Sequence, residues 1–395
     1  MHSRFSTNGK PISLLGFGAM RIPTKPGSSE FDAALFNEYV AELLAGGVTY
    51  FDTSPAYCRG ESERLLGNAL AASGAAREKY ILATKLSNFA EAQFSLEKVK
   101  AMFASSLKNL RTSYIDNYLL HSLGGGDGMG LFRRRMLDNG AIDFCLEQRA
   151  AGIIRNLGFS FHGKRKVFDW CLEHHDKYKW DFVQIVINYV DWRRGEAKAL
   201  YEALAAKKIP VVVMAPLQGG RLARYNWALA NELVPRDPKA SLAKWALRFA
   251  ASRPQVMTVL SGMAKMEHIK ENLETFTAFK PLSADEEAAL FRAADIAARQ
   301  ATIPCNDCKY CMPCPYGLDI PAILSFRNRM KTLEKPLSAR ETLAAYEKAI
   351  PESLRRAEHC TGCGRCSPHC PQQLDIPSEI AAIDEWIEEL KNEAL

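Results

Sequence analysis

The chain has 395 residues and a formal net charge of +6, with 51 basic and 45 acidic side chains interspersed along it. This modest charge argues against a nucleic-acid-binding surface, and a chain of this length can bury a sizeable core. No apolar run approaches the length of a membrane span, and the first residues lack the apolar stretch of a secretion signal. We therefore expect a globular cytoplasmic protein with neither nucleic acid nor a membrane as a partner. The basic run at residues 133–135 is interpreted as the solvated start of a helix.

Short apolar runs alternate with amphipathic helical patterns from residue 12 to residue 280. The apolar runs predict strands at residues 12–18, 49–52, 80–85, 115–121, 153–160, 182–188, 209–215 and 257–261. The helical patterns predict helices at residues 31–44, 61–72, 96–110, 164–175, 196–206 and 239–251, and one that ends near Ala151. Eight β-then-α units in one stretch predict an α/β fold, a closed (β/α)8 TIM barrel. An open dinucleotide-binding sheet is less favoured because the turn at residues 16–21 lacks the third glycine of its fingerprint.

The composition changes after the eighth strand. Residues 281–300 show a charged, alanine-rich helical pattern, and the remainder holds eight of the eleven cysteines, several prolines and no convincing strand. We therefore predict a domain boundary near Ala301, with the barrel in residues 1–300 and a mostly α-helical, ferredoxin-like domain in residues 301–395.

Four ionisable residues lie at the ends of three successive predicted strands. Asp52 and Tyr57 follow the second strand, Lys85 ends the third and His121 ends the fourth. Taken singly, each has an ordinary explanation: a capping carboxylate, a tyrosine on the barrel rim, a surface-reaching lysine and a buried core histidine. The carboxyl ends of the strands meet at one mouth of a (β/α)8 TIM barrel, where catalytic residues lie. Together, the four side chains suit proton transfer to a carbonyl or alkoxide oxygen.

These residues carry a resemblance to the aldo-keto reductases that covers about residues 10–280. The matching motifs are FDTSPAY at residues 51–57, GESE at 60–63 followed by LG at 66–67, ATK at 83–85, and LLH at 119–121. The resemblance implies that Tyr57 donates a proton to the carbonyl oxygen as hydride reaches the carbon. Lys85 would place a cation beside the forming phenolate and Asp52 would hold Lys85, while His121 would orient the carbonyl or help relay the proton.

The same resemblance implies an extended NADP(H) across the barrel mouth. Its expected contacts are Ser160, Gln184, Pro216, Leu217, Gly219, Gly220, Ser261, Gly262, Lys265 and Asn272. Ser261, Gly262 and Lys265 at a helix N-terminus suit a 2′-phosphate, and the alternative is a plain strand-to-helix turn with a surface lysine.

Two positions depart from the family pattern. Phe161 follows Ser160 where the family usually has asparagine, and Met214 and Ala215 stand where an aromatic residue is usual. Both positions contact the nicotinamide in the family, and one interpretation is that Phe161 takes over the stacking. The choice between NADPH and NADH therefore stays open.

The cysteines form two runs that each end in Cys-Pro. The residues are Cys305, Cys308, Cys311 and Cys314 in the first run, and Cys360, Cys363, Cys366 and Cys370 in the second. The second run has bacterial ferredoxin spacing, in which the first three cysteines bind one cluster and the fourth binds the other. This predicts two [4Fe-4S] clusters, one on Cys305, Cys308 and Cys311 with Cys370, the other on Cys360, Cys363 and Cys366 with Cys314. Two tetrathiolate zinc sites are the alternative.

Aldo-keto reductase barrels with a C-terminal two-cluster module form a recognisable group of predicted oxidoreductases, and the chain resembles them throughout. The favoured function is NAD(P)H-dependent reduction of a small carbonyl compound, or oxidation of the alcohol. A second is cluster-coupled electron transfer with a ferredoxin-like redox partner. A flavin such as FMN would then be needed to split the electron pair, although the sequence carries no flavin fingerprint. A third is a non-catalytic redox-sensing module. Nothing in the sequence indicates the oligomeric state.

Overall fold

The computed structural model describes residues 1–395 except residues 6–8, 27, 225–226, 300–301, 308, 352–353, 355, 371 and 395. Contacts divide the chain into two units, a first unit of Met1–Pro216 and Leu247–Leu282 and a second unit of Leu217–Ala246 and Ser283–Leu395. The second unit thus includes the segment after the seventh barrel strand. Ala301, near which we predict a domain boundary, lies outside the described residues, and that division of the chain stays a prediction.

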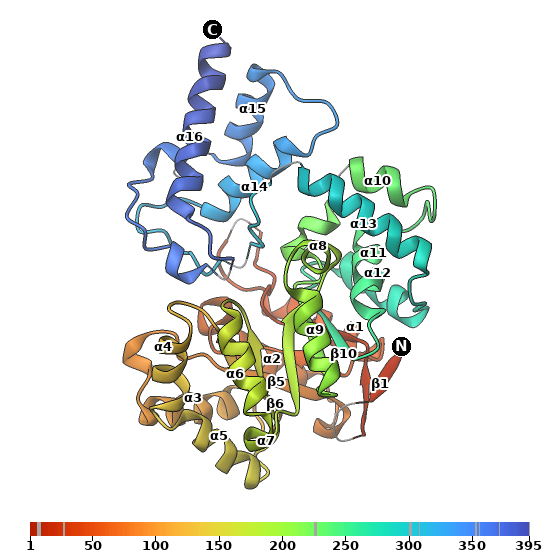
Figure 1. The fold of residues 1–395 in the computed structure, drawn as a ribbon, viewed down its shortest axis with the longest axis vertical. Coiled ribbons are helices and arrows are strands. Elements are labelled where there is room, and N and C mark those ends of the chain that lie inside the picture. Colours follow the sequence, from red (N-terminus) through yellow and green to blue (C-terminus); the bar gives the residue numbers. More distant parts are fainter. Residues whose placement is uncertain are drawn as a thin grey trace. The chain divides into compact units, whose positions relative to one another are not determined.

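The first unit contains a closed barrel of eight parallel strands, which confirms the predicted fold class (Figure 1). The strands are β3 (Leu15–Gly18), β4 (Tyr50–Asp52), β5 (Ile81–Leu86), β6 (Ile115–Leu123), β7 (Ile154–Phe161), β8 (Phe182–Val186), β9 (Val211–Met214) and β10 (Val256–Ser261). They follow one another around the barrel in chain order, and β10 closes it against β3. A short antiparallel pair, β1 (Ser3–Phe5) and β2 (Pro11–Ser13), precedes the barrel. Strand β1 was not predicted, and the predicted strand at residues 12–18 is divided between β2 and β3.

Helices connect the barrel strands, as the sequence patterns predict. Their bounds are α1 (Ala33–Ala45), α2 (Ser62–Ala72), α3 (Leu96–Asn109), α4 (Met129–Phe132), α5 (Ala141–Ala150), α6 (Arg165–Glu173), α7 (His175–Tyr178), α8 (Tyr189–Arg194), α9 (Ala197–Ala206), α11 (Leu242–Ala251) and α12 (Met266–Thr277). Among the described residues, no helix is both long and apolar enough to cross a membrane.

The parallel register brings the carboxyl ends of β4, β5 and β6 to one level. Gly18 pairs with Asp52, Asp52 with Ala83, and Lys85 with Leu119. Residues two apart on a strand share a face. Lys85 therefore points into the barrel from one step above the level of Asp52, and this register places the two charges together.

The GESE–LG motif fixes the connection from β4 to α2. The Ser62 hydroxyl donates to the carbonyl oxygen of Ala19 at 2.6 Å, and Glu63 accepts from the Thr84 hydroxyl at 2.6 Å. A Cβ on Gly67 would lie 2.3 Å from the carbonyl oxygen of Asn109, so glycine permits close packing of α2 on the end of α3. The motif thus holds the turn after β4 against β5.

The second unit is mostly helical in its C-terminal part, as predicted. Its helices are α10 (Trp227–Leu233), α13 (Ala284–Arg299), α14 (Ile320–Lys331), α15 (Ala339–Ala349) and α16 (Ile376–Glu393). Helix α10 packs on α13, and α16 packs on both α14 and α15 (Figure 1). Buried Ile323, Ile380 and Ile383 belong to the core of this bundle. Both α14 and α16 begin with Asp-Ile-Pro, where the aspartate is the N-cap and proline lies in the first turn.

Candidate active site and cluster-binding loops

A buried ion pair lies at the centre of the predicted catalytic set. The Lys85 ammonium donates to Oδ1 of Asp52 at 2.5 Å and to the carbonyl oxygen of Thr53 at 2.7 Å. The Lys85 nitrogen lies 4.8 Å from the centre of the Tyr57 ring. The structure therefore brings Asp52, Tyr57 and Lys85 together. The Lys85 ammonium lies between the Asp52 carboxylate and the Tyr57 ring, where its positive charge would stabilise a negative charge on the Tyr57 oxygen.

Burial dominates the electrostatics of this pair. Burial raises the pKa of the Asp52 carboxyl, and the Lys85 ammonium beside it pulls that pKa back down. Burial likewise lowers the pKa of Lys85, and the Asp52 carboxylate offsets part of this effect. Oδ2 of Asp52 is buried without a hydrogen-bond partner among the residues that the structure describes. Each charge therefore depends on the other, because neither has water to solvate it.

The turn that carries Tyr57 has an unusual backbone. Cys58, Arg59 and Gly60 have φ angles of 51°, 57° and 90°, three left-handed residues in succession. The left-handed region costs a residue other than glycine about 1–2 kcal/mol. The turn is held by the Cys58 thiol, which donates to the carbonyl oxygen of Met20 at 3.4 Å, and by the Arg59 guanidinium over the ring of Phe31 at 4.7 Å. Such strain is typical of functional loops.

His121 lies beside Tyr57, with the two ring centres 5.7 Å apart in an edge-to-face arrangement. Nδ1 of His121 lies 2.6 Å from the Ser87 hydroxyl and 3.3 Å from the Ser54 hydroxyl. Burial holds the pKa of His121 well below its ordinary value, and the charges of Lys85 and Arg135 lower it further. The ring is therefore neutral at physiological pH. All four predicted catalytic residues thus lie in one place.

Three residues of this site were not predicted. Ser54 and Ser87 each follow a predicted catalytic residue by two positions, after Asp52 and Lys85 respectively. The period of two along a strand is the signal that could have identified them. The third is Arg135.

Arg135 corrects our interpretation of the basic run at residues 133–135. The exposed side chains of Arg133 and Arg134 pair with Asp138 and Asp127, but Arg135 is buried. Its guanidinium donates to the carbonyl oxygens of His121 at 2.9 Å and Asn88 at 3.0 Å. The cause is a π-helical turn, Arg133–Leu137, which directs the Arg135 side chain inward. No pattern in the sequence predicted this turn.

Two predicted cofactor residues lie on neighbouring barrel strands. Ser160 of β7 pairs in register with Gln184 of β8. The Ser160 hydroxyl accepts from the backbone N–H of Ser122 at 2.7 Å. The Gln184 amide nitrogen faces the Met214 sulfur at 3.5 Å, whereas its oxygen Oε1 is buried without a partner among the described residues. An unsatisfied buried acceptor fits a ligand that brings an N–H group, such as a carboxamide.

A second group of predicted cofactor residues lies where β10 leads into α12. Asn272 donates to the Ser261 hydroxyl at 3.0 Å, and Lys265 is exposed at the N-cap of α12. A Cβ on Gly262 would lie 3.6 Å from Cδ of Arg21. Two cationic side chains and a helix N-terminus therefore border this glycine turn, which fits an anionic group. Pro216, also predicted, is the last residue of the first of the two segments that form the first unit.

The remaining predicted cofactor residues, Leu217, Gly219 and Gly220, belong to the second unit. Gly219 and Gly220 have φ angles of 70° and 96° within the turn Gln218–Ala223. A Cβ on Gly219 would lie 1.7 Å from the carbonyl oxygen of Asn306, and the Arg221 guanidinium donates to the Thr302 hydroxyl at 2.8 Å. This turn therefore packs on the segment that carries the first cysteine run.

The structure does not support Phe161 as a nicotinamide-stacking residue. Its ring lies 5.1 Å from that of Phe168 on α6, and the side chain is buried. A Cβ on Gly124 would meet this ring at 2.7 Å. Phe161 thus fills the layer between the barrel and its helices.

The two cysteine runs fold into matching loops. In the second run, the residues that flank Cys363 are Gly362 and Gly364, with φ angles of 68° and 71°. In the first run, the corresponding residues are Asp307 and Lys309, with φ angles of 53° and 64°. Cys308, which lies between them, is outside the described residues. Left-handed residues thus occupy equivalent positions in the two runs.

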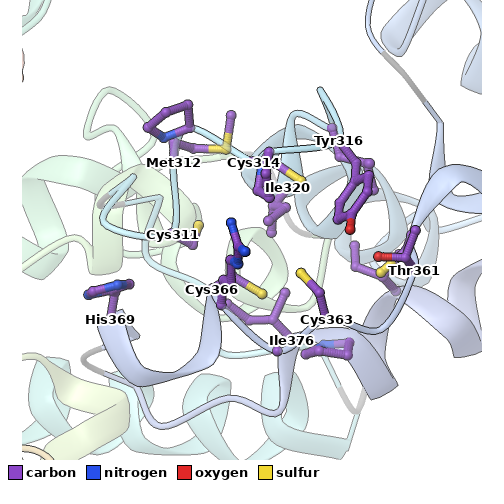
Figure 2. A pocket seen from close by; sticks show the side chains of 18 of the residues that line it. Cys311, Met312, Cys314, Tyr316, Ile320, Thr361, Cys363, Cys366, His369 and Ile376 are labelled. Carbon is purple, nitrogen blue, oxygen red and sulfur yellow. The ribbon is translucent and has the colours of Figure 1, made fainter.

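The thiols of the two runs border one cavity of about 410 Å³ in the second unit. Its lining includes Cys311, Cys314, Cys360, Cys363 and Cys366. Figure 2 shows the sulfur atoms of Cys314, Cys363 and Cys366 directed toward the middle of the cavity, while Cys311 lies on the side of His369.

The electrostatic neighbours of two further thiols indicate which cysteines lie near one another. Burial raises the pKa of Cys305, and the neighbouring Cys370 thiol adds to the rise. Burial also raises the pKa of Cys366, with Cys360 and Cys363 nearby. Cys305 therefore lies near Cys370, and Cys366 near Cys360 and Cys363. Cysteine thiols gathered around a cavity fit an iron–sulfur cluster, which they would bind as thiolates.

Comparison with known proteins gives matches for both parts of the chain. Residues 14–295 match the Aldo/keto reductase family, and residues 304–374 match the 4Fe-4S dicluster domain. L-galactose dehydrogenase of Arabidopsis thaliana is 26% identical over 295 residues, which cover 71% of this chain and 89% of the relative. Methylglyoxal reductase YeaE of Escherichia coli (strain K12) is 28% identical over 259 residues, covering 61% and 80%. The structure of the holo form of aldo-keto reductase AKR11C1 from Bacillus halodurans superposes with a TM-score of 0.61 at 25% identity, covering 74% of this chain and 96% of that one.

The neutral His121 ring predicts a pH dependence of stability. In the folded chain the pKa of His121 lies well below its ordinary value. Below about pH 6.5, His121 is therefore protonated in the unfolded chain and remains neutral in the folded chain. The free energy of unfolding should therefore fall on acidification from about pH 7 to 5, by at most about 1.4 kcal/mol per pH unit for this group. Urea unfolding under anaerobic conditions measures it. The His121→Gln variant removes this contribution, and equal pH slopes for both proteins would contradict the assignment.

Proposed function

The chain belongs to the aldo/keto reductase family, and we propose that it reduces a small carbonyl compound with hydride from NADP(H), Tyr57 acting as the proton donor. The observation that carries the proposal is the buried Lys85–Asp52 pair directly beneath the Tyr57 ring. A buried ion pair costs desolvation energy, and apolar side chains of similar volume would stabilise the fold as well at these two positions. Its position has a function if negative charge forms on the Tyr57 oxygen.

Each residue of the site has a separate role in proton transfer. Tyr57 gives its proton to the carbonyl oxygen, which leaves a phenolate. Lys85 stabilises that phenolate, and Asp52 keeps Lys85 charged in a buried position. Neutral His121 orients the carbonyl oxygen beside Tyr57. The same residues, acting in reverse, would accept the proton of an alcohol.

The cofactor site supports a pyridine nucleotide. When bound, NADP(H) supplies the hydride. The unsatisfied Oε1 of Gln184 would accept from the carboxamide, and Lys265 with Arg21 would face an anionic phosphate near Gly262. The relatives named above, a methylglyoxal reductase and an L-galactose dehydrogenase, suggest a small aldehyde, ketone or sugar-like substrate.

The 4Fe-4S dicluster match and the paired loops support two [4Fe-4S] clusters rather than two zinc ions. We assign Cys305, Cys308, Cys311 and Cys370 to one cluster, and Cys360, Cys363, Cys366 and Cys314 to the other. The neighbouring positions of Cys305 and Cys370, at opposite ends of the two runs, support this exchange of the fourth ligand.

A second candidate function, electron transfer between the clusters and an external redox partner, rests on one observation. The turn Gln218–Ala223, which the family resemblance assigns to the cofactor, packs on the segment of the first cysteine run through Gly219 and Arg221. Cys363 is also exposed, so one cluster would lie near the surface. This function would require a flavin or another two-electron-to-one-electron converter.

Replacement of Tyr57 tests the proton donor. The Tyr57→Phe variant keeps the ring and loses the hydroxyl, so kcat for carbonyl reduction should fall by about 10²–10⁴-fold. The dissociation constant of NADPH, measured by fluorescence titration, should not change. The matched control is Tyr178→Phe on α7, a buried tyrosine outside the site. Unchanged turnover in Tyr57→Phe would eliminate Tyr57 as the acid.

Metal analysis tests the clusters. Anaerobically purified protein should contain about eight irons and about eight acid-labile sulfides per chain. The Cys370→Ala variant should lose about half of this iron or more, because one cluster loses its fourth ligand. Cys145→Ala, at a buried cysteine of α5, is the control and should retain all of it. A chain that binds zinc alone would contradict the assignment.

A further inference from the structure

The two serines beside His121 have no role in the function proposed above. Ser87 lies directly after β5, two residues beyond Lys85, and is 4% exposed. Ser54 lies two residues beyond Asp52 and is fully buried. Their hydroxyl oxygens are 2.8 Å apart, and both face Nδ1 of His121. A buried hydroxyl pair on the rear of a buried imidazole determines which ring nitrogen carries the proton.

The hydroxyl protons can be counted. Each serine hydroxyl donates one hydrogen bond and accepts up to two. The Ser54 oxygen already accepts from the backbone N–H of Ala56 at 3.1 Å. If Ser54 donates to Ser87 at 2.8 Å, and Ser87 donates to Nδ1 of His121 at 2.6 Å, both protons are used in hydrogen bonds of ordinary length. In this arrangement Nδ1 is an acceptor and Nε2 carries the ring proton.

The opposite tautomer leaves a proton poorly placed. With a proton on Nδ1, the ring donates to Ser87. If Ser87 then donates to Ser54, the Ser54 proton has no acceptor among the described residues. If Ser54 instead donates to Ser87, the Ser87 proton must reach the carbonyl oxygen of Lys85 at 3.4 Å. That distance is long for an O–H donor.

The structure assigns Ser87, oriented by Ser54, as the positioning residue that keeps His121 in the Nε2–H tautomer. Among the described residues, no protein group hydrogen-bonds Nε2, so this nitrogen is left for the substrate. His121 then presents a neutral N–H donor beside Tyr57. Tyr57 and His121 would both bond the carbonyl oxygen, and only Tyr57 would release its proton. This assignment deepens the proposed function and rests on it.

Nitrogen-15 NMR of histidine-labelled protein tests the tautomer without any turnover. Protonated and unprotonated ring nitrogens resonate far apart, and the His121→Gln variant identifies the His121 signals. We expect Nε2 to be the protonated nitrogen in the intact protein, and both tautomers to be populated in Ser87→Ala. The control is Ser13→Ala, a buried serine that bonds Thr49 and Leu15 before β3. A protonated Nδ1 in the intact protein would overturn the assignment.

A double-mutant cycle tests the consequence for catalysis. Ser87→Ala should lower kcat for carbonyl reduction by roughly threefold to tenfold, the effect of one lost hydrogen bond, with unchanged NADPH affinity. Glutamine has no tautomers, so in the His121→Gln background the same replacement should have an effect below about twofold. Equal losses in both backgrounds would show that Ser87 acts by packing. An intact protein that reduces no carbonyl would refute the proposed function alone, because the NMR result does not depend on activity.

Discussion

The burial of one charge pair constrains the rest of the barrel mouth. Lys85 and Asp52 are almost completely removed from water, and Oδ2 of Asp52 has no hydrogen-bond partner in the described part of the chain. Such a pair persists only if its surroundings hold both side chains, since removal of one partner leaves a buried charge that costs about 3–5 kcal/mol. The register of β4 and β5, the carbonyl oxygen of Thr53 and the Glu63–Thr84 hydrogen bond provide that support. The strained turn that carries Tyr57 then places its ring over the cation.

The sequence predicted the barrel because its parallel strands are buried on both faces and appear as separate apolar runs. It predicted Asp52, Tyr57, Lys85 and His121 because these residues lie near or just after the carboxyl ends of three successive strands and match the motifs of the family. It missed what depends on three-dimensional contacts. The π-helical turn that buries Arg135 has no sequence signal, and the three-residue strands β1 and β2 are too short to show a period. The alternation of side chains along a strand could have identified Ser54 and Ser87, because each lies two residues after a predicted site residue. Their contact with Nδ1 of His121, on another strand, could not be predicted in this way.

For the cysteine runs too, the spacing of residues predicted the local loops but not their contacts with distant segments. Spacing indicated two loops of ferredoxin type, and left-handed residues lie at equivalent positions in both runs. Spacing did not indicate that the turn Gln218–Ala223 would pack on the first run through Gly219. This contact explains why the second unit includes a segment that follows a barrel strand. It also explains why electron transfer remains a candidate beside hydride transfer.

Isotope transfer tests the central claim, that hydride passes directly from the nicotinamide to a carbonyl carbon under Tyr57. The protein is supplied under argon with NADPH that carries deuterium at C4 of the nicotinamide on the transferred face, together with a small aldehyde such as methylglyoxal. The account predicts a product alcohol with one deuterium on the former carbonyl carbon, detected by mass spectrometry and NMR. Product that forms at the same rate with hydrogen from solvent at that carbon would contradict it, because the electrons would then have left the nicotinamide by another path.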